Sequence, residues 1–247
     1  VISTWGAIKA MLNAMETHSE SAAVQESCCG ALRNLVACNE DCKATILSDG
    51  GVNAVIATMR KHSVAVGVQE DGCAILRILA GGKDDRSVAV TSAGGVEVVI
   101  SAMGTHPGSM DVQKHGCGAL RNMAARHHRT VAAARGVEAI VRAMGLHSES
   151  AGVQEYGCAA LANMAAGSED VRAAVASTDA IDAVVRALAA HGGSVRVQEH
   201  GCGALANLAA GAEDVRAKVA AAGGIVAVVM LMGAHSTSVR VQERGCG

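Results

Sequence analysis

The sequence predicts an all-α protein, a solenoid of stacked three-helix repeats of about 44 residues each. Three observations lead to this prediction. Three different residue markers recur along the chain with one spacing, and the apolar residues within each repeat follow a helical period. The 247 residues also contain a single proline, Pro107, so continuous helix is permitted nearly everywhere.

The markers are a Val-Gln-Glu tripeptide or its variant, a cysteine and a histidine. They recur in steps of 44, 44, 41, 44 and 44 residues. The tripeptide begins at Val24, Val68, Val112, Val153, Val197 and Val241. The cysteines are Cys29, Cys73, Cys117, Cys158, Cys202 and Cys246, and the histidines are His18, His62, His106, His147, His191 and His235. We therefore place one repeat domain over residues 1–247, with repeats at about 1–39 (partial), 40–83, 84–125, 126–168, 169–212 and 213–247 (partial).

Each repeat is expected to begin with a short helix, such as Glu213–Val219. Its acidic residues fall in the first turn, where the helix dipole favours them, and Val215 and Val219 are spaced four apart. A glycine pair then supplies a turn with backbone angles that other residues avoid. The pair recurs at Gly50-Gly51, Gly94-Gly95 and Gly223-Gly224.

The second helix carries apolar residues at i, i+3, i+4 and i+7, the pattern of one buried face. In the second repeat these residues are Val52, Val55, Ile56 and Met59. The recurrent histidine ends this helix, where we expect it to complement the helix dipole and cap carbonyl groups.

A serine three residues after the histidine is expected to cap the start of the third helix. It is present in five of the six repeats, as Ser21, Ser109, Ser150, Ser194 and Ser238, and Ala65 is the exception. In the first repeat the third helix is expected over Val24–Ala37, roughly 21 Å long. We expect it to bury Val24, Cys28, Ala31, Leu32 and Leu35.

The single short step falls at Arg126–Arg129, where three residues are absent relative to the stretch after Ala165. Because loops tolerate such deletions, we expect a shortened loop here, with His127 and His128 in a cationic patch. The chain begins and ends inside repeats without polar capping repeats. A fragment of a longer array is therefore expected, and ends covered by another protein or another copy are the alternative.

The full motif, Gly-Gly-Val/Ile followed by Val-Gln-Glu-x-Gly-Cys-x-Ala-Leu-x-Asn-Leu, resembles the armadillo repeat in a Gly- and Cys-rich variant. Residues 112–124 and 197–209 are good examples. The resemblance covers the whole chain and implies a right-handed superhelix whose third helices line a concave groove. HEAT-type solenoids, which have two helices per repeat and lack the glycine pair, rank second.

The resemblance implies a non-catalytic scaffold that holds a protein or peptide partner in this groove. In the best-studied armadillo proteins an Asn near the end of the third helix binds the backbone of an extended peptide. A side-chain amide suits this role because it both donates and accepts. The matching residues are Asn34, Asn122, Asn163 and Asn207, with Ile78 in the second repeat. Alternatively, each Asn bonds its own helix end or a neighbouring repeat.

Importin-type members add a Trp four residues before the Asn, and no Trp stands there in this chain. Recognition of nuclear-import signals is therefore not expected, and the small residues at these positions should leave a wide groove, open to a helix or a folded partner. The residues are Gly30, Ala74, Gly118, Ala159 and Gly203.

Third-helix positions that vary between repeats are candidates for partner specificity. We expect a mixed-charge groove that is more basic in its N-terminal half, with Tyr156 as the aromatic anchor. The remaining candidates are Glu155, Glu199, His115, His200, Arg33, Arg77 and Arg121. The alternative is that these charges form a merely solvated helix face.

Composition argues against other classes of function. The net charge of −2 and the scarcity of aromatic residues do not favour nucleic-acid binding. Residues 225–234, the most apolar stretch, are too few to insert across a membrane. Neither a metal-ligand pattern nor a catalytic constellation emerges, so we expect no metal, no cofactor and no enzyme activity. Cysteines repeated inside a helix suit buried free thiols in a reducing compartment, the cytoplasm or nucleus.

A second function class stays open. The chain would then be a structural component of a larger cytoskeletal, ciliary or other assembly that makes contacts through its ends or its convex face. End-to-end self-association is possible in that case.

Overall fold

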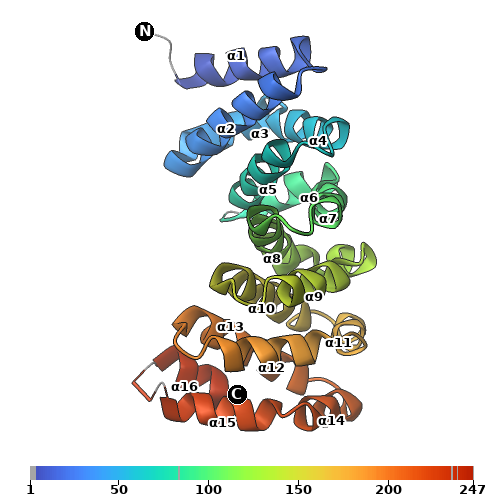
Figure 1. Ribbon diagram of the computed structural model, residues 1–247, viewed down its shortest axis with the longest axis vertical. Coiled ribbons are helices and arrows are strands. Elements are labelled where there is room, and N and C mark those ends of the chain that lie inside the picture. The colour runs from blue at the N-terminus through green and yellow to red at the C-terminus, as the bar shows by residue number, and fades with distance from the viewer. Residues whose placement is uncertain (1–3, 83, 235, 238, 247) are drawn as a thin grey trace. The chain divides into compact units, whose positions relative to one another are not determined.

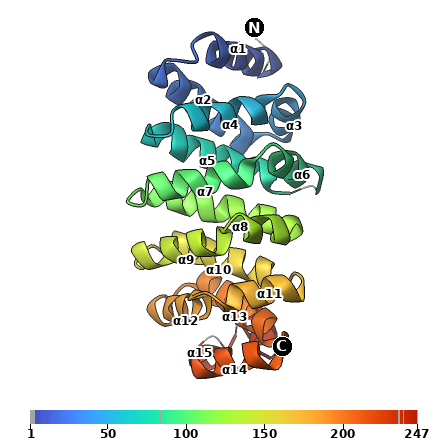
Figure 2. The same ribbon diagram turned by 90° about the vertical axis from the view of Figure 1, so that its right-hand side faces the viewer.

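The computed structural model describes residues 4–82, 84–234, 236–237 and 239–246, and all regular structure in these residues is α-helical (Figure 1). The predicted all-α fold class is thus confirmed. The chain divides into two compact units, Val1–Met123 and Ala124–Gly247, which are described separately. Within each unit, the helices of successive repeats are layered one on the next (Figure 2).

The N-terminal unit begins with the second and third helices of the first repeat. Two three-helix repeats follow, and the third helix of the last one continues past the end of the unit. The helices are α1 (Thr4–Thr17), α2 (Ala22–Cys38), α3 (Glu40–Ser48), α4 (Gly51–Lys61), α5 (Val66–Ala80), α6 (Asp84–Ser92), α7 (Gly95–Thr105) and α8 (Met110–Ala133).

The C-terminal unit continues the same order of short, second and third helices. Its first short helix is the last part of α8. The others are α9 (Gly136–Leu146), α10 (Ala151–Ala165), α11 (Glu169–Ala176), α12 (Ala180–Ala190), α13 (Val195–Ala209), α14 (Glu213–Ala221), α15 (Gly224–Ala234) and α16 (Val239–Cys246).

The predicted glycine turn is confirmed at the start of the second helices. Gly50, Gly94 and Gly223 have left-handed backbone angles, with φ of 78°, 88° and 79°. The following glycine is required for a different reason, since a Cβ atom on Gly51 would lie 2.9 Å from the carbonyl oxygen of Ile46. The short helix and the second helix therefore approach too closely for any side chain at this position.

The predicted helix faces are partly confirmed. Val52, Val55, Ile56 and Met59 of α4 are all buried. The expected face of α2 was wrong in one respect, because Ala31 is exposed, while Val24 and Leu35 are half-buried. The side chains of Gln25, Cys29 and Val36 are buried as well. Helix α2 packs against α1, α3 and α5, so its buried face is wider than a single stripe.

Serine caps the third helices as predicted. The hydroxyl oxygens of Ser21, Ser109, Ser150 and Ser194 accept the backbone N–H three residues further on, at 3.2 to 3.5 Å. Ala65 starts α5 without a side-chain cap, and Ser238 and His235 lie outside the described residues.

The loop expected at Arg126–Arg129 is absent. Helix α8 runs through this segment with a single break in helical geometry at His127, where φ is −118° and ψ is 39°. The three missing residues are those that form the connection elsewhere, so the third helix passes directly into the next short helix. Arg135 takes the left-handed conformation, with φ of 65°, at the turn that follows.

Five of the repeated cysteines lie among the residues whose side chains the structure describes, and all five are buried outside any disulfide, packed as small apolar side chains: Cys29, Cys73, Cys117, Cys158 and Cys202. Burial raises the pKa of Cys29, Cys73 and Cys117 to about 12, so these thiols stay protonated at neutral pH. The described residues contain no group of three or more His, Cys, Asp or Glu side chains placed to hold a metal ion. No single helix among them is long and apolar enough to cross a membrane, although Arg86–Ser92 and Gly95–Thr105, bent by 67°, meet the length and composition criteria as a pair.

Candidate functional site

The third helices carry all of the candidate binding residues. In the N-terminal unit these helices are α2, α5 and the first part of α8, and in the C-terminal unit they are α10, α13 and α16. The predicted asparagine row lies on them, and its members differ in their partners. Asn34 is exposed and makes no side-chain hydrogen bond within the described part of the chain.

Two asparagines are already bound to the preceding repeat. The Nδ2 atom of Asn122 donates to the carbonyl oxygen of Arg77 at 2.8 Å, and that of Asn207 donates to Ala162 at 2.9 Å. Both side chains are half-buried, as is that of Asn163. A bound peptide would therefore meet mainly the amide oxygen of Asn122 or Asn207, which is an acceptor for a peptide N–H.

Arg33, Arg77 and Arg121 occupy equivalent positions on α2, α5 and α8, and all three are half-buried. The guanidinium of Arg33 pairs with Asp71 on α5, at 2.6 Å between Nη1 and Oδ1. Burial raises the pKa of Asp71, Arg33 opposes this shift, and the nearby Glu26 adds to it. The repeat pattern alone did not single out Asp71 as a site residue.

His115 lies on α8, close enough to Arg77 and Arg33 to sense their charges, and is half-buried. Its Nδ1 atom is buried without a hydrogen-bond partner. Burial lowers the pKa of His115 to about 4, and the positive charges of Arg77 and Lys114 contribute further. Asp111 acts in the opposite direction, but the imidazole is still neutral at physiological pH.

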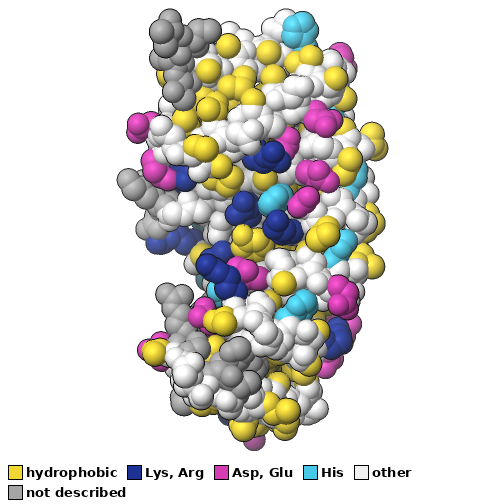
Figure 3. All heavy atoms as spheres, turned by 60° about the vertical axis from the view of Figure 1, so that its left-hand side comes forward, with side chains coloured by type: hydrophobic (Ala, Val, Ile, Leu, Met, Phe, Trp, Pro, Cys, Tyr) yellow, Lys and Arg dark blue, Asp and Glu magenta, His cyan; other side chains and the backbone are white. Residues whose placement is uncertain are grey.

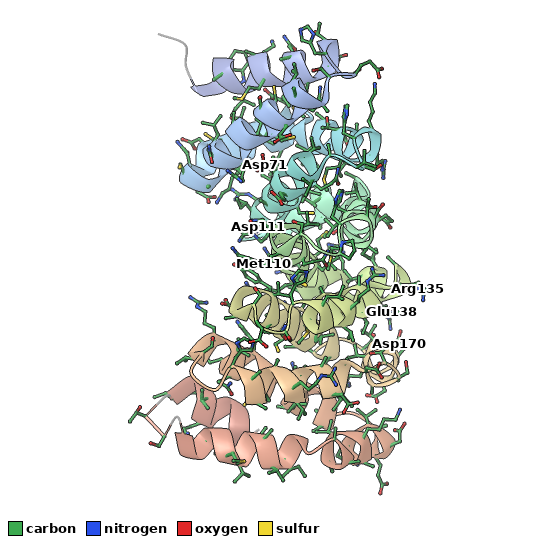
Figure 4. The ribbon with its side chains drawn as sticks, in the orientation of Figure 1. Asp71, Met110, Asp111, Arg135, Glu138 and Asp170 are labelled. Atoms are coloured by element: carbon green, nitrogen blue, oxygen red, sulfur yellow. The ribbon has the colours of Figure 1, made fainter. Side chains whose placement is uncertain are left out.

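Charged side chains gather on the face formed by the third helices. In Figure 3, Lys and Arg side chains surround a histidine on this face, with acidic side chains next to them. Figure 4 places Asp71 on α5 and Asp111 at the start of α8, on the same side of the N-terminal unit. The mixed charge expected of this face is therefore present in the N-terminal unit.

In the C-terminal unit the candidates are half-buried on α10 and α13. They are Glu155, Tyr156, Asn163, Glu199, His200 and Asn207. Glu155 reaches the next third helix, with its Oε1 atom 3.6 Å from Nη1 of Arg196. The equivalent Glu70 accepts a hydrogen bond from the hydroxyl of Ser109 at 2.8 Å. This glutamate position thus contributes to the contact between repeats, in addition to any role in binding.

The glutamine of the Val-Gln-Glu motif is buried and holds the second helix to the third. The Nε2 atom of Gln25 donates to the carbonyl oxygens of Met15 and His18, at 2.9 and 3.0 Å. The same pair of bonds recurs in four further repeats, at Gln69, Gln113, Gln154 and Gln198. In the sequence this residue served as a marker without an assigned role, although its constancy was the available signal.

The recurrent histidine ends the second helix as expected, and it also contacts the preceding repeat. The Nε2 atoms of His62, His106 and His191 lie 2.8, 2.7 and 2.6 Å from the backbone oxygens of Ser19, Ser63 and Ser148, respectively. Because a carbonyl oxygen only accepts, each ring donates from Nε2. The sequence did not reveal this second contact.

Comparison with known proteins agrees with the repeat motif. Residues 6–123 match the family model described as the LRRK2 ARM repeat. No curated protein matches the chain.

Several solved structures share the fold. An engineered protein superposes with a TM-score of 0.83 at 25% identity, covering 97% of this chain and 93% of that one. A designed armadillo repeat protein in complex with the peptide (KR)4 gives 0.79 at 18% identity, covering 98% and 97%. A structure that concerns a phosphorylation switch in the interaction between cadherin and β-catenin gives a TM-score of 0.81 at 19% identity, covering 98% of this chain and 51% of that one. On its recurrent motif, its helical fold and these similarities, the chain has the fold of the armadillo-repeat proteins.

Proposed function

We propose that this chain is a non-catalytic scaffold that binds a segment of a partner protein along its third helices. The observation that carries the proposal is a division of roles among the residues of each repeat. The constant glutamine and histidine are used in contacts within and between repeats. The variable positions lie half-exposed on the third helices, at one-repeat spacing, where they are available to a partner.

The proposed binding residues divide by role. The asparagines supply amide groups for a partner's backbone, and Tyr156 supplies a rigid aromatic surface. Charge selection would come from Glu155, Glu199, His115, His200, Arg33, Arg77 and Arg121. The similar structures support the proposal, since one contains a designed armadillo protein with a bound peptide and another concerns cadherin and β-catenin.

Selection from a random peptide library tests whether the chain binds peptide segments, without assuming the sequence of the partner. Peptides displayed on phage are selected against the whole chain, and their affinities are measured by fluorescence anisotropy. Asn34→Ala is the most direct variant, because this exposed side chain has no role in the stack. Asn53→Ala, at an exposed position of α4, is the matched control.

We expect Asn34→Ala and Tyr156→Ala to weaken the selected peptides and Asn53→Ala to leave them unchanged. A library that yields no binder, or binders insensitive to both groove variants, would contradict groove binding. Urea unfolding of each variant separates a lost contact from a lost fold.

One observation favours the alternative, a structural component that contacts other molecules through its ends or outer face. Val226 and Met230 of α15 are 62% and 71% exposed. The equivalent positions of α12 carry Asp182 and Arg186, which are also exposed even though another repeat follows them. Light scattering over a concentration series tests self-association through this face, and a strictly monomeric chain would contradict it.

The proposal includes a reducing compartment, the cytoplasm or the nucleus. Its support is that the repeated cysteines in the described part of the chain are buried and form no disulfide. Fractionation of the natural source with an antibody to the chain tests this location, and recovery from a secreted fraction would contradict it.

A further inference from the structure

The amide oxygen of the buried glutamine faces the second helix of the next repeat. In the first repeat, the Oε1 atom of Gln25 accepts a hydrogen bond of 2.8 Å from the hydroxyl of Thr58 on α4. The Nε2 atom of Gln25 is already bonded to carbonyl oxygens of its own repeat. Thr58 therefore completes the hydrogen bonding of a side chain that is only 1% exposed.

The later repeats keep the glutamine but not the threonine. The positions equivalent to Thr58 hold Ala102, Ala143, Ala187 and Leu231. Gln154 of α10 is 2% exposed, and its Nε2 atom is bonded within its own repeat, as that of Gln25 is. Its Oε1 atom accepts no hydrogen bond from the described part of the chain. Such an acceptor costs stability unless water or a ligand supplies the donor.

Gln154 is within reach of a ligand, because it lines an open crevice. The crevice has a volume of about 570 Å³ and lies between α9 and α12, which pack together in the C-terminal unit (Figure 2). Ala187, at the position equivalent to Thr58, lines the same crevice. The place that the threonine hydroxyl fills in the first repeat is therefore open beside Gln154. Small-molecule sites have volumes of roughly 300 to 1,000 Å³.

The walls of this crevice suit a flat ring. Apart from Met144, the residues without a polar side chain that line it are small, namely Gly145, Ala183, Ala187, Ala189 and Ala190. Small side chains leave room for a planar group between the helices, and a methionine sulfur packs favourably against an aromatic ring. A Cβ atom on Gly145 would meet no other part of the chain within 4 Å, so the crevice is open at this point.

The polar groups of the crevice differ in depth and in charge. Gln154 is buried and offers an acceptor, whereas Arg186 is exposed and offers a cation. Arg186 is the only charged residue among those that line the crevice, and it forms no ion pair within the described residues. A ligand that satisfies both groups needs a hydrogen-bond donor at its inner end and a negative charge at its outer end.

We propose that the crevice between α9 and α12 binds a small aromatic carboxylate whose ring carries a hydroxyl or N–H donor. The ring donor bonds to Oε1 of Gln154, the ring packs against Met144 and the alanines, and the carboxylate pairs with Arg186. This site lies beside the second helices, so the proposal goes beyond segment binding along the third helices and does not depend on it. A tyrosine side chain of a protein carries the same donor and is the competing source.

An NMR titration of the whole chain tests the ligand chemistry. The probe is para-hydroxyphenylpropanoate, and two analogues remove one feature each: a methoxy group replaces the hydroxyl, or an amide replaces the carboxylate. We expect saturable shifts of the backbone amides of Ala187 and Ala190 and of the side-chain amide of Gln154. Each analogue should bind about tenfold more weakly, the effect of losing one hydrogen bond or ion pair.

Matched variants locate the site. Ala187→Thr copies the arrangement of Thr58, so it should weaken the probe at least tenfold and raise the urea midpoint of unfolding. Ala187→Val has the same shape without the hydroxyl and should block the probe with a smaller rise. Arg186→Gln should weaken the carboxylate probe about tenfold and leave the amide analogue unchanged. Arg142→Gln, at the equivalent exposed position of α9, does not line this crevice and should change neither.

The contrary outcomes are distinct. Equal binding of the hydroxyl and methoxy probes would overturn the role of Gln154. If no probe gives saturable shifts while Ala187→Thr still raises the urea midpoint, the crevice holds water alone and the proposal fails. Tighter binding of the blocked dipeptide acetyl-Tyr-Asp-amide than of the free acid would overturn the small-molecule source and assign the crevice to a protein side chain. None of these results alters the test of the third helices with Asn34→Ala.

Discussion

Replacing Gln154 with methionine tests the hydrogen bonds that hold a second helix to its third helix. The Nε2 atom of Gln154 donates to the carbonyl oxygens of Met144 and His147, at 2.8 and 3.0 Å. The oxygen of His147 also accepts the N–H of Ser150 at 3.0 Å, so it keeps a partner in the variant. The oxygen of Met144, at the buried end of α9, loses the donor from Gln154.

The expected loss of stability follows from this difference. A buried carbonyl left unsatisfied costs about 1 to 3 kcal/mol, and the shared bond to His147 adds about 0.5 to 1 kcal/mol. Methionine is close to glutamine in size and apolar, so no large cavity opens. We therefore expect Gln154→Met to lower the free energy of unfolding by about 2 to 3 kcal/mol.

Urea unfolding followed by circular dichroism measures the change, and hydrogen exchange of α9 shows where it acts, because solenoids do not always unfold in one step. Asn53→Met makes a comparable amide-to-thioether change on the exposed face of α4 and is the control. A loss for Gln154→Met no larger than that of the control would refute the reasoning.

Three further predictions concern other parts of the fold. Gly136→Ala should lower the free energy of unfolding by about 2 kcal/mol, because the new Cβ would lie 2.7 Å from a backbone carbonyl oxygen. Gly145→Ala, on the same helix, places its Cβ more than 4 Å from any atom apart from its chain neighbours and its own helix backbone, and should raise the free energy of unfolding by about 0.5 to 1 kcal/mol. Thermal unfolding measures both changes. Because the pKa of His115 is lowered in the folded chain, the unfolded chain binds this proton first as the pH falls. The free energy of unfolding should therefore fall below pH 6.5 and level off near pH 4, by about 1 kcal/mol after allowance for partial exposure. His115→Gln should remove this part of the pH dependence of stability. Val226→Asp with Met230→Arg should leave stability unchanged and reduce any concentration-dependent association seen by light scattering. The glycine argument would be contradicted if Gly136→Ala stabilised the protein or Gly145→Ala destabilised it. The histidine argument would be contradicted if His115→Gln kept the same pH dependence of stability. The third argument would be contradicted if the double variant associated as strongly as the unmodified chain.

The sequence was sufficient for the fold because each repeat supplies independent copies of the same local signals. Serine caps, left-handed glycines and the apolar face of α4 all lie where the pattern predicted them. The prediction was wrong at one junction between repeats, where the local sequence alone did not determine the backbone conformation. A deletion at Arg126–Arg129 was interpreted as a shorter loop, but helix continuation with a break at His127 satisfies the backbone without one.

The candidate site was predictable only in part. Half-exposure of the variable positions followed from the repeat, since positions free to vary are those not needed by the stack. The Arg33–Asp71 ion pair and the orphaned Nδ1 of His115 depend on how side chains of neighbouring repeats meet. Such contacts join residues about one repeat apart, and periodicity places them on a face without giving their distances.

The histidine contact between repeats bears on how an array of this kind changes its length. His62, His106 and His191 each reach a backbone oxygen of the preceding repeat, an atom that every residue type provides. The contact therefore makes no demand on the neighbour's side chain at that point. A duplicated or deleted repeat would find the same acceptor on its new neighbour, so recombination can shuffle whole repeats while the junction chemistry is preserved.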